Sequence, residues 1–262
     1  MINGVTPATT IDDILVQLEI TIADGIRTNS RTGYFAALYY KVTAGVKEGI
    51  AKGLFENGPR MEQFDVIFAK RYLDALNAWK KNEPVTESWR AAFDAANNGS
   101  LLVLQQLLLG MNAHINLDLG IAAVAVSGGQ LDTVQKDFYT INAIISSLTY
   151  QVLNDIDRVS PLLSLLGLHA GNQTAILIQF SIDNARDGAW CFAEELVTKQ
   201  GAAYDACIAQ RDQTIKKLAD DLVHTKGVMR FTIWLIHLFE WKNIAKIIKV
   251  LHGAAKKKIV VG

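Results

Sequence analysis

The sequence predicts an all-α fold, a single compact domain of about nine or ten helices packed mostly antiparallel. Apolar residues recur at helical spacing along most of the chain, and the strict alternation typical of strands is not found. Only four prolines occur, and they follow other break signals, as in ENGP, NEP and VSP. The 262 residues fit one large domain, 1–262, because no linker is long or polar enough to divide the chain.

Capping and turn residues predict where each helix begins and ends. Thr10 and Asp13 form a capping-box pair at the start of the first helix, and Thr86 is expected to cap the fourth. A short turn, PLLSLLG, separates two long helices in the second half. The expected helices cover residues 9–25, 33–53, 60–81, 86–99, 101–126, 130–157, 172–200, 202–224 and 228–253.

Composition narrows the functional classes. Lys plus Arg equals Asp plus Glu, at 26 each, so the chain has no basic footprint for nucleic acid. The first residues, MINGVTPATTIDD, carry no secretory signal pattern, so a cytoplasmic location is expected. Cys191 and Cys207 form no CxxC pair, and we expect both to be buried as small apolar residues.

The C-terminal segment, 228–262, is expected to form a basic amphipathic helix and tail. Lys242, Lys246 and Lys249 recur at helical spacing on one face, opposite apolar residues, and AAKKK follows. Such a helix can lie on a membrane surface. The favoured alternative is a terminal helix docked on the core with a solvated lysine face.

The stretch LLLGMNAHINLDLGIAA, residues 107–123, is apolar but carries four polar side chains at alternate positions. His114 and Asp118 are four residues apart, so they share a helix face and can touch. Asn112 and Asn116 point roughly 160° away, toward other helices. No Lys, Arg or Glu occurs between residues 101 and 130, which predicts a buried central helix. Its polar groups therefore need polar partners or a bound species.

Two kinds of chemistry suit these residues. His114 with Asp118 is an acid/base pair, with Asp65 orienting or charging it and Arg186 holding an anionic group of the substrate. Alternatively His114 and Asp118 are half of a divalent-metal site that Asp65 or Asp137 completes. No zinc-protease, P-loop, GxSxG or GxGxxG motif supports a particular reaction. Further residues expected to bind substrate are Tyr72, Arg71, Asn142, Asp187 and Tyr34.

The same polar residues have a structural alternative, a satisfied buried network that fixes how the central helices register. Two functions therefore stay open at this point. One is an enzyme acting on a small, partly apolar molecule, with hydrolysis or another proton transfer as the favoured class. The other is a non-catalytic helical protein that binds lipid, associates with a membrane or acts as a scaffold. The pattern predicts neither a particular cofactor nor an oligomeric state.

Several runs of the chain resemble a bacterial domain-of-unknown-function family from about Ile11 to His237. The resemblance rests on GYFAALYYKVT, FDVIFAKRYLDAL, LLLGMNAHINLDLGIAA, DFYTINAI and SIDNARDGAW, and NAHINLDLGIA is its most specific element. It implies an all-α fold and no particular reaction. It also singles out Asp65, Arg71, Tyr72, Asp74, Asn112, His114, Asn116, Asp118, Asp137, Asn142, Arg186 and Asp187. Gln106 stands where members of that family often carry His, which weakens the metal hypothesis.

Overall fold

The computed structural model describes residues 8–166 and 172–253, with the side chains of residues 172–180 left out. Every regular element in this part of the chain is helical, so the all-α prediction is confirmed. The elements are α1 (Ile11–Thr28), α2 (Thr32–Ala51), α3 (Gly58–Lys80), α4 (Glu87–Ala95), α5 (Val103–Ala113), η1 (His114–Asp118), α6 (Leu119–Ser127), α7 (Asp132–Val159), η2 (Leu163–Leu166), α8 (Asn172–Leu196), α9 (Ala202–Val223), α10 (Gly227–Phe239) and α11 (Ile244–Gly253).

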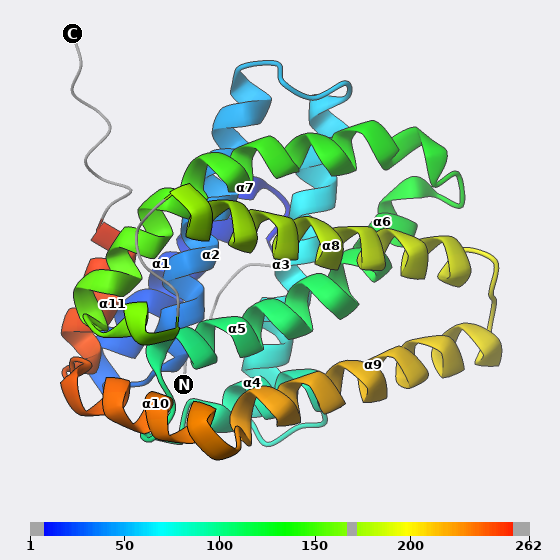
Figure 1. Cartoon of the computed structure of the whole chain (residues 1–262). Helices are drawn as coiled ribbons and strands as arrows, with labels where there is room; N and C mark the ends of the chain where they lie inside the picture. The colour runs from blue at the N-terminus through cyan, green and yellow to red at the C-terminus, as the bar shows by residue number, and fades with distance from the viewer. Residues whose placement is uncertain (1–7, 167–171, 254–262) are drawn as a thin grey trace, which may run out of the picture.

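The elements α5, η1 and α6 form one continuous helix through the middle of the molecule (Figure 1). Its first part packs on α2, α4 and α9, and its last part packs on α3 and α8. By length and composition alone it is the one helix of the described residues that could cross a membrane, but 72% of its apolar window is buried inside the protein. An apolar helix covered on all sides by other helices is the core of the fold, as its sequence predicts.

This central helix contains a π-helical turn, η1, which the sequence did not predict. The backbone N–H of Leu119 bonds to the carbonyl of His114, five residues earlier, rather than to the residue four earlier. Such single-turn π-bulges are rare and are frequent at functional sites. The turn begins at His114 and ends at Asp118, the two residues that the sequence singles out for chemistry.

Some helices are capped at their start by neighbouring residues, and others by a side chain that is distant in the sequence. The capping box of Thr10 and Asp13 is confirmed at the start of α1. Thr86 holds the predicted N-cap position of α4, but its side chain makes no capping hydrogen bond. Instead, Asp212 of α9 accepts from the backbone N–H groups of Glu87 (2.7 Å) and Ser88 (2.9 Å). A buried carboxylate satisfies two free N–H groups and suits the positive end of the helix dipole better than one hydroxyl.

The expected single helix over 228–253 is two helices, α10 and α11, because the chain turns at Glu240. The buried Glu240 carboxylate accepts from the N–H of Val103 at the start of α5 (3.1 Å) and from the hydroxyl of Ser160. The N–H of Trp241 bonds to the carbonyl of Val159 (2.9 Å). These contacts hold Glu240 in extended backbone, which ends α10. The AAKKK part of the predicted tail lies outside the described residues.

The two cysteines do not lie in the core. Cys191 is exposed and Cys207 is half-buried, so the expectation that both are buried is wrong. Cys191 lies on α8, and Cys207 lies on α9, where it packs against the edge of a small apolar cluster that contains Phe192 and Ile215.

Candidate functional site

Asp118 is a buried carboxylate that receives hydrogen bonds from three different parts of the chain. Nε of Arg71, on α3, donates to Oδ1 at 2.6 Å. Nε1 of Trp89, on α4, donates to Oδ2 at 2.8 Å. Nδ1 of His114 lies 3.2 Å from the same Oδ2. Asp118 itself has no exposed surface, so these three donors replace the water that the charge would otherwise need.

His114 is oriented by this carboxylate. Because a carboxylate only accepts, Nδ1 carries the proton and Nε2 keeps a free lone pair. Burial lowers the pKa of His114 and outweighs the opposing effect of Asp118, so the imidazole is neutral at pH 7. Nε2 is buried and has no hydrogen-bond partner among the described residues. A neutral imidazole with its second nitrogen fixed by an aspartate has the form of a general base.

Aromatic rings surround the imidazole of His114. Phe68 stacks on it, with ring centroids 3.6 Å apart. Tyr39 meets it edge to face at 4.6 Å, and Phe35 does so at 5.8 Å. Gly110, one turn before His114, makes room for Phe35, since a Cβ on that glycine would lie 2.6 Å from the Phe35 ring. The imidazole therefore sits in an apolar aromatic cage that explains its low pKa.

Other buried polar atoms near this cage lack partners. They are Oδ2 of Asp65 and the hydroxyl of Tyr72, both on α3. Burial raises the pKa of Asp65 to about 8, so this carboxyl is protonated at neutral pH and can donate a hydrogen bond. The Asp65 charge is also a cause of the raised pKa of Tyr39, whose ring touches His114. A buried polar atom without a partner costs free energy, so such a group often marks a bound water or ligand.

Asn112 and Asn116 lie on the opposite side of the central helix, as the sequence predicts. Nδ2 of Asn112 donates to the carbonyl of Ile215 on α9 (3.0 Å), and Nδ2 of Asn116 donates to Oδ1 of Asn112 (2.9 Å). Arg211 of α9 completes this contact by donating to the backbone carbonyl of Asn116 (3.0 Å). The asparagine pair therefore fastens the central helix to α9 and takes no part in the His114 site.

Arg186 and Asn142 lie together in a second cluster, between α7 and α8. The Arg186 guanidinium bonds to Oδ1 of Asn142 and to the carbonyl of Phe138, and it lies 4.5 Å from the centre of the Phe138 ring. Burial lowers its pKa to about 10. Asp187 is next to Tyr139, whose pKa it helps to raise. None of the hydrogen bonds of Arg186 among the described residues reaches His114 or Asp118, so the structure does not join this cluster to the site.

Asp137 and Tyr34 also lie elsewhere. Oδ1 of Asp137 accepts from the N–H of Glu56 at 2.7 Å, and its Oδ2 lies 3.2 Å from Arg60, so it holds the chain just before α3. Burial raises the pKa of Tyr34, and the nearby Glu240 adds to this rise while Arg31 opposes it. Within residues 8–166 and 172–253 no three His, Cys, Asp or Glu side chains are grouped to hold a metal ion. The divalent-metal hypothesis for His114, Asp118, Asp65 and Asp137 therefore gains no support from the geometry.

Sequence reasoning missed Trp89 and Phe68 as parts of this site. Trp89 lies in the expected helix over 86–99, and its indole N–H bonds to Asp118. An indole N–H that is buried needs an acceptor, and this is the one signal that pointed to a polar partner. Phe68 gave no signal beyond core packing. Tyr39 belongs to the aromatic run GYFAALYY, which indicates core packing or, at Tyr34 and Tyr39, the wall of an apolar pocket.

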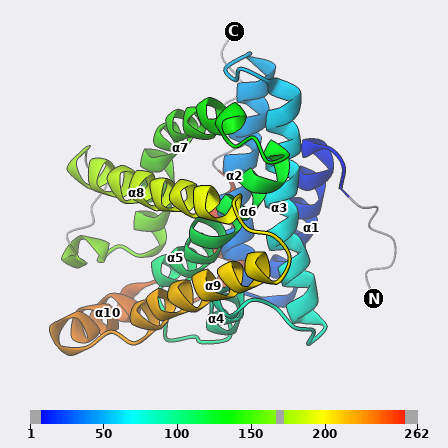
Figure 2. The same ribbon diagram turned by 90° about the vertical axis from the view of Figure 1, so that its right-hand side faces the viewer.

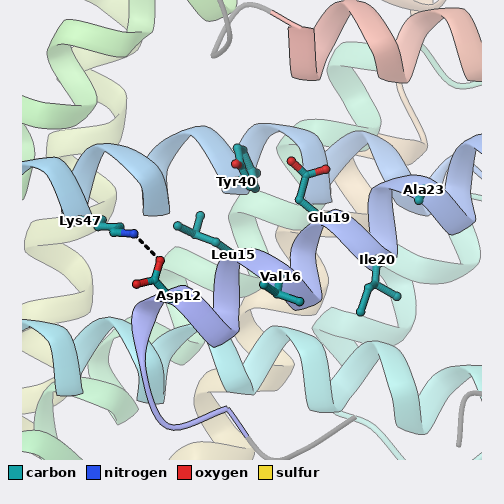
Figure 3. A pocket seen from close by; sticks show the side chains of 8 residues that line it. All are labelled: Asp12, Leu15, Val16, Glu19, Ile20, Ala23, Tyr40 and Lys47. Carbon is teal, nitrogen blue, oxygen red and sulfur yellow. Dashed lines mark hydrogen bonds and ion pairs between the residues drawn. The ribbon is translucent and has the colours of Figure 1, made fainter. Parts of the chain in front are cut away.

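A hollow on the surface lies away from this site, between α1 and α2 (Figure 3). Figure 3 shows Lys47 reaching across to Asp12, with which it forms an ion pair, and Val16 and Ile20 lining the hollow along α1. These side chains are largely exposed, and the charged pair bridges one end. The hollow contains no group with the character of a base or nucleophile comparable to His114.

Fold and site together define an all-α protein with an aspartate-fixed histidine at a π-turn of its central helix. Residues 11–225 match a family described as a family of unknown function (DUF5995), and the chain belongs to that family. The match covers α1 to α9, and α10 and α11 follow it. No curated protein and no solved structure matches the chain.

Proposed function

We propose that the protein is an enzyme that performs a proton-transfer step on a small, partly apolar molecule, with His114 as the general base. One observation carries this proposal. Nε2 of His114 has no hydrogen-bond partner among the described residues, while Nδ1 of the same ring is held by Asp118. A base that works near neutral pH must be unprotonated there, and the lowered pKa of His114 meets this requirement.

Asp65 supplies the complementary acid in this proposal. Its pKa of about 8 keeps it protonated at neutral pH, while His114 stays neutral. Two titratable groups with environments that fix one as acid and one as base are the usual mark of acid/base catalysis. The hydroxyl of Tyr72, buried and without a partner among the described residues, is available to bind a polar atom of the substrate.

The substrate has an aromatic or aliphatic body, because Phe35, Phe68, Tyr39 and Tyr72 form the walls around His114. Entry requires a side chain to move, since His114 is only 2% exposed. Phe68 is half-buried and covers one face of the imidazole, so its rotation is the shortest route from solvent to the site. Hydrolysis, in which His114 removes a proton from water, is the first reaction to assay.

The experiment compares wild type with His114→Gln and Asp65→Asn for hydrolysis of p-nitrophenyl acetate and p-nitrophenyl butyrate. Loss of a general base lowers the rate by about 10²–10⁴-fold. Asp74→Asn, an exposed change on the same helix as Asp65, is the control and keeps the wild-type rate. Equal rates in wild type and His114→Gln, at equal stability, would falsify the hydrolytic form of the proposal.

A second candidate is a non-catalytic protein in which the same network only fixes helix packing. One observation favours it: the donors on Asp118 come from α3, α4 and η1, so the carboxylate joins three elements. In that case His114→Gln lowers stability and changes no reaction. Unfolding curves measured beside the rates separate the two candidates.

A further inference from the structure

Helix α10 turns its apolar side chains outward. Val228 is 83% exposed, Phe231 62% and Trp234 54%, while Leu238 and Phe239 are also more than half exposed. Ile236 is the residue of α10 that is fully buried. In an ordinary surface helix only the side that faces the core is apolar, whereas α10 has apolar residues on its outer side as well.

The exposed side chains form a continuous face. At 100° per residue, Val228, Phe231, Trp234 and Leu238 follow one another along one side of the helix. The rings of Phe231 and Trp234 touch, with centroids 5.7 Å apart. Figures 1 and 2 show α10 at the edge of the molecule, with one long side away from the other helices. Contiguous apolar patches on a protein surface mark interaction sites.

The C-terminal end of α10 is anchored to the rest of the protein. Its last turn leads into Glu240, whose N–H bonds to the carbonyl of Ile236 (3.0 Å). The Glu240 carboxylate is held by the N–H of Val103 and the hydroxyl of Ser160. Rotating α10 to bury its apolar face would break these contacts. The face is therefore held toward solvent.

The C-terminal part of the chain, which contains α10, differs from the rest in its net charge. Residues 226–262 contain eight Lys or Arg and one acidic residue, the buried Glu240, whereas residues 1–225 contain 18 basic and 25 acidic residues. The neutral total therefore conceals a basic C-terminal segment. Lys226 and Arg230 are exposed at the start of α10, and Lys242 is exposed just after its end. The closest preceding acids in sequence belong to α9, where Asp220 is paired with Lys216 (2.6 Å).

We propose that α10 docks on the surface of a membrane that contains anionic lipids. The aromatic and aliphatic face enters the boundary between headgroups and acyl chains, and the flanking basic side chains bind the headgroups. The 13 residues of α10 are too few to span a bilayer, which needs roughly 20. Lipid fits this face better than a second copy of the chain, because a two-fold contact through α10 would bring two basic ends together.

The test is co-sedimentation of the full chain with vesicles of phosphatidylcholine, with and without phosphatidylglycerol. Wild type is expected to bind the anionic vesicles and to dissociate at high salt. The double variants Phe231→Ser with Trp234→Ser, and Lys226→Glu with Arg230→Glu, each lose about tenfold or more of this binding. Val16→Ser with Leu54→Ser, which also changes two exposed apolar residues, is the matched control and binds as wild type.

Three results would overturn the proposal. One is wild type that stays in the supernatant with anionic vesicles. Another is equal binding by wild type and the Phe231/Trp234 variant. The third is a wild-type dimer in light scattering that the same variant converts to a monomer without any vesicle binding, which would assign the face to a second copy. All substituted side chains are exposed, and thermal melts verify that each variant is folded.

Discussion

The imidazole of His114 lies flat against the ring of Phe68, with centroids 3.6 Å apart and planes that differ by 3°. This contact has two consequences. It removes one face of the imidazole from water, which contributes to the burial that lowers the pKa of His114. It also makes Phe68, which is half-buried, a partly exposed side chain in direct contact with His114.

Replacing Phe68 by Ala tests this role directly. The pKa of His114 is expected to rise, because burial is the main cause that lowers it and Asp118 remains in place to favour the charged form. The loss of a half-buried ring should lower the free energy of unfolding by about 2–3 kcal/mol. Titration of the His114 resonance by NMR measures the first effect and urea unfolding the second. Phe231→Ala, on exposed α10, serves as the control, and an unchanged His114 pKa in Phe68→Ala would exclude Phe68 as the cover.

Asp65 should make the protein less stable as the pH rises. Its pKa is about 8 when folded and 3.8 in its ordinary state, so between these values the folded chain binds more protons than the unfolded one. Stability due to this group is therefore full below about pH 4 and is lost progressively up to about pH 8, at about 1.4 kcal/mol for each pKa unit. Asp65→Asn removes this loss, so its stability relative to wild type should increase between pH 5 and pH 8.

Urea unfolding of wild type and Asp65→Asn at several pH values measures this difference. Asp74→Asn is the matched control, since Asp74 lies on the same helix but is exposed. The control should follow wild type at every pH. Parallel curves for Asp65→Asn and wild type would mean that Asp65 is charged when folded, and the acid in the proposed mechanism would then have to be another group.

Removing the charge of Asp118 should destabilise the fold strongly. Asp118→Asn keeps the shape of the side chain but replaces one acceptor by a donor, so one of the N–H groups of Arg71, Trp89 and His114 loses its partner. The expected loss of unfolding free energy is about 3–5 kcal/mol, typical of breaking a buried charged pair. Asp220→Asn, which breaks the exposed pair with Lys216, should cost less than about 1 kcal/mol. Equal effects of the two variants in urea unfolding would contradict the central position given to Asp118.

Local signals in the sequence predict much of this fold. Helical spacing gives the helices, the Thr10 and Asp13 pair gives one cap, and the absence of Lys, Arg and Glu gives the central helix. Spacing alone also places His114 beside Asp118. These features depend on residues within one or two turns of each other, for which helix geometry is known in advance.

The remaining features depend on residues far apart in the chain. Trp89 is 29 residues from Asp118, and Asp212 is 124 residues from Ser88, whose N–H it accepts. A sequence indicates that a buried polar group needs a hydrogen-bond partner. It does not indicate which of several suitable residues, far away in the chain, is that partner. Arg186 illustrates the difficulty, because it was grouped with His114 and instead bonds to Asn142. The π-turn escapes prediction for another reason, since its sequence is as compatible with an ordinary α-turn.

Two glycines, Gly120 in the central helix and Gly188 on α8, provide a final, paired prediction. A Cβ on Gly120 would lie 2.7 Å from the Phe192 ring and 2.8 Å from the carbonyl oxygen of Ala189, so α6 and α8 approach closely at this point. Backbone atoms cannot move aside as a flexible side chain can, so Gly120→Ala should lower the free energy of unfolding by about 1–3 kcal/mol. Gly188 of α8 is different, because a Cβ there would lie 3.7 Å from the Arg211 guanidinium, an ordinary contact.

The Gly188→Ala variant should therefore stabilise the protein by about 0.5–1 kcal/mol, the usual gain for alanine inside a helix. The two expected changes in the free energy of unfolding have opposite signs, although both substitutions add one methyl group. Gly120 lies on α6 and Gly188 on α8, two helices that pack on each other. Urea unfolding of the two variants under one set of conditions measures both values. Destabilisation by Gly188→Ala, or no effect of Gly120→Ala, would show that α6 and α8 are packed differently from the arrangement described.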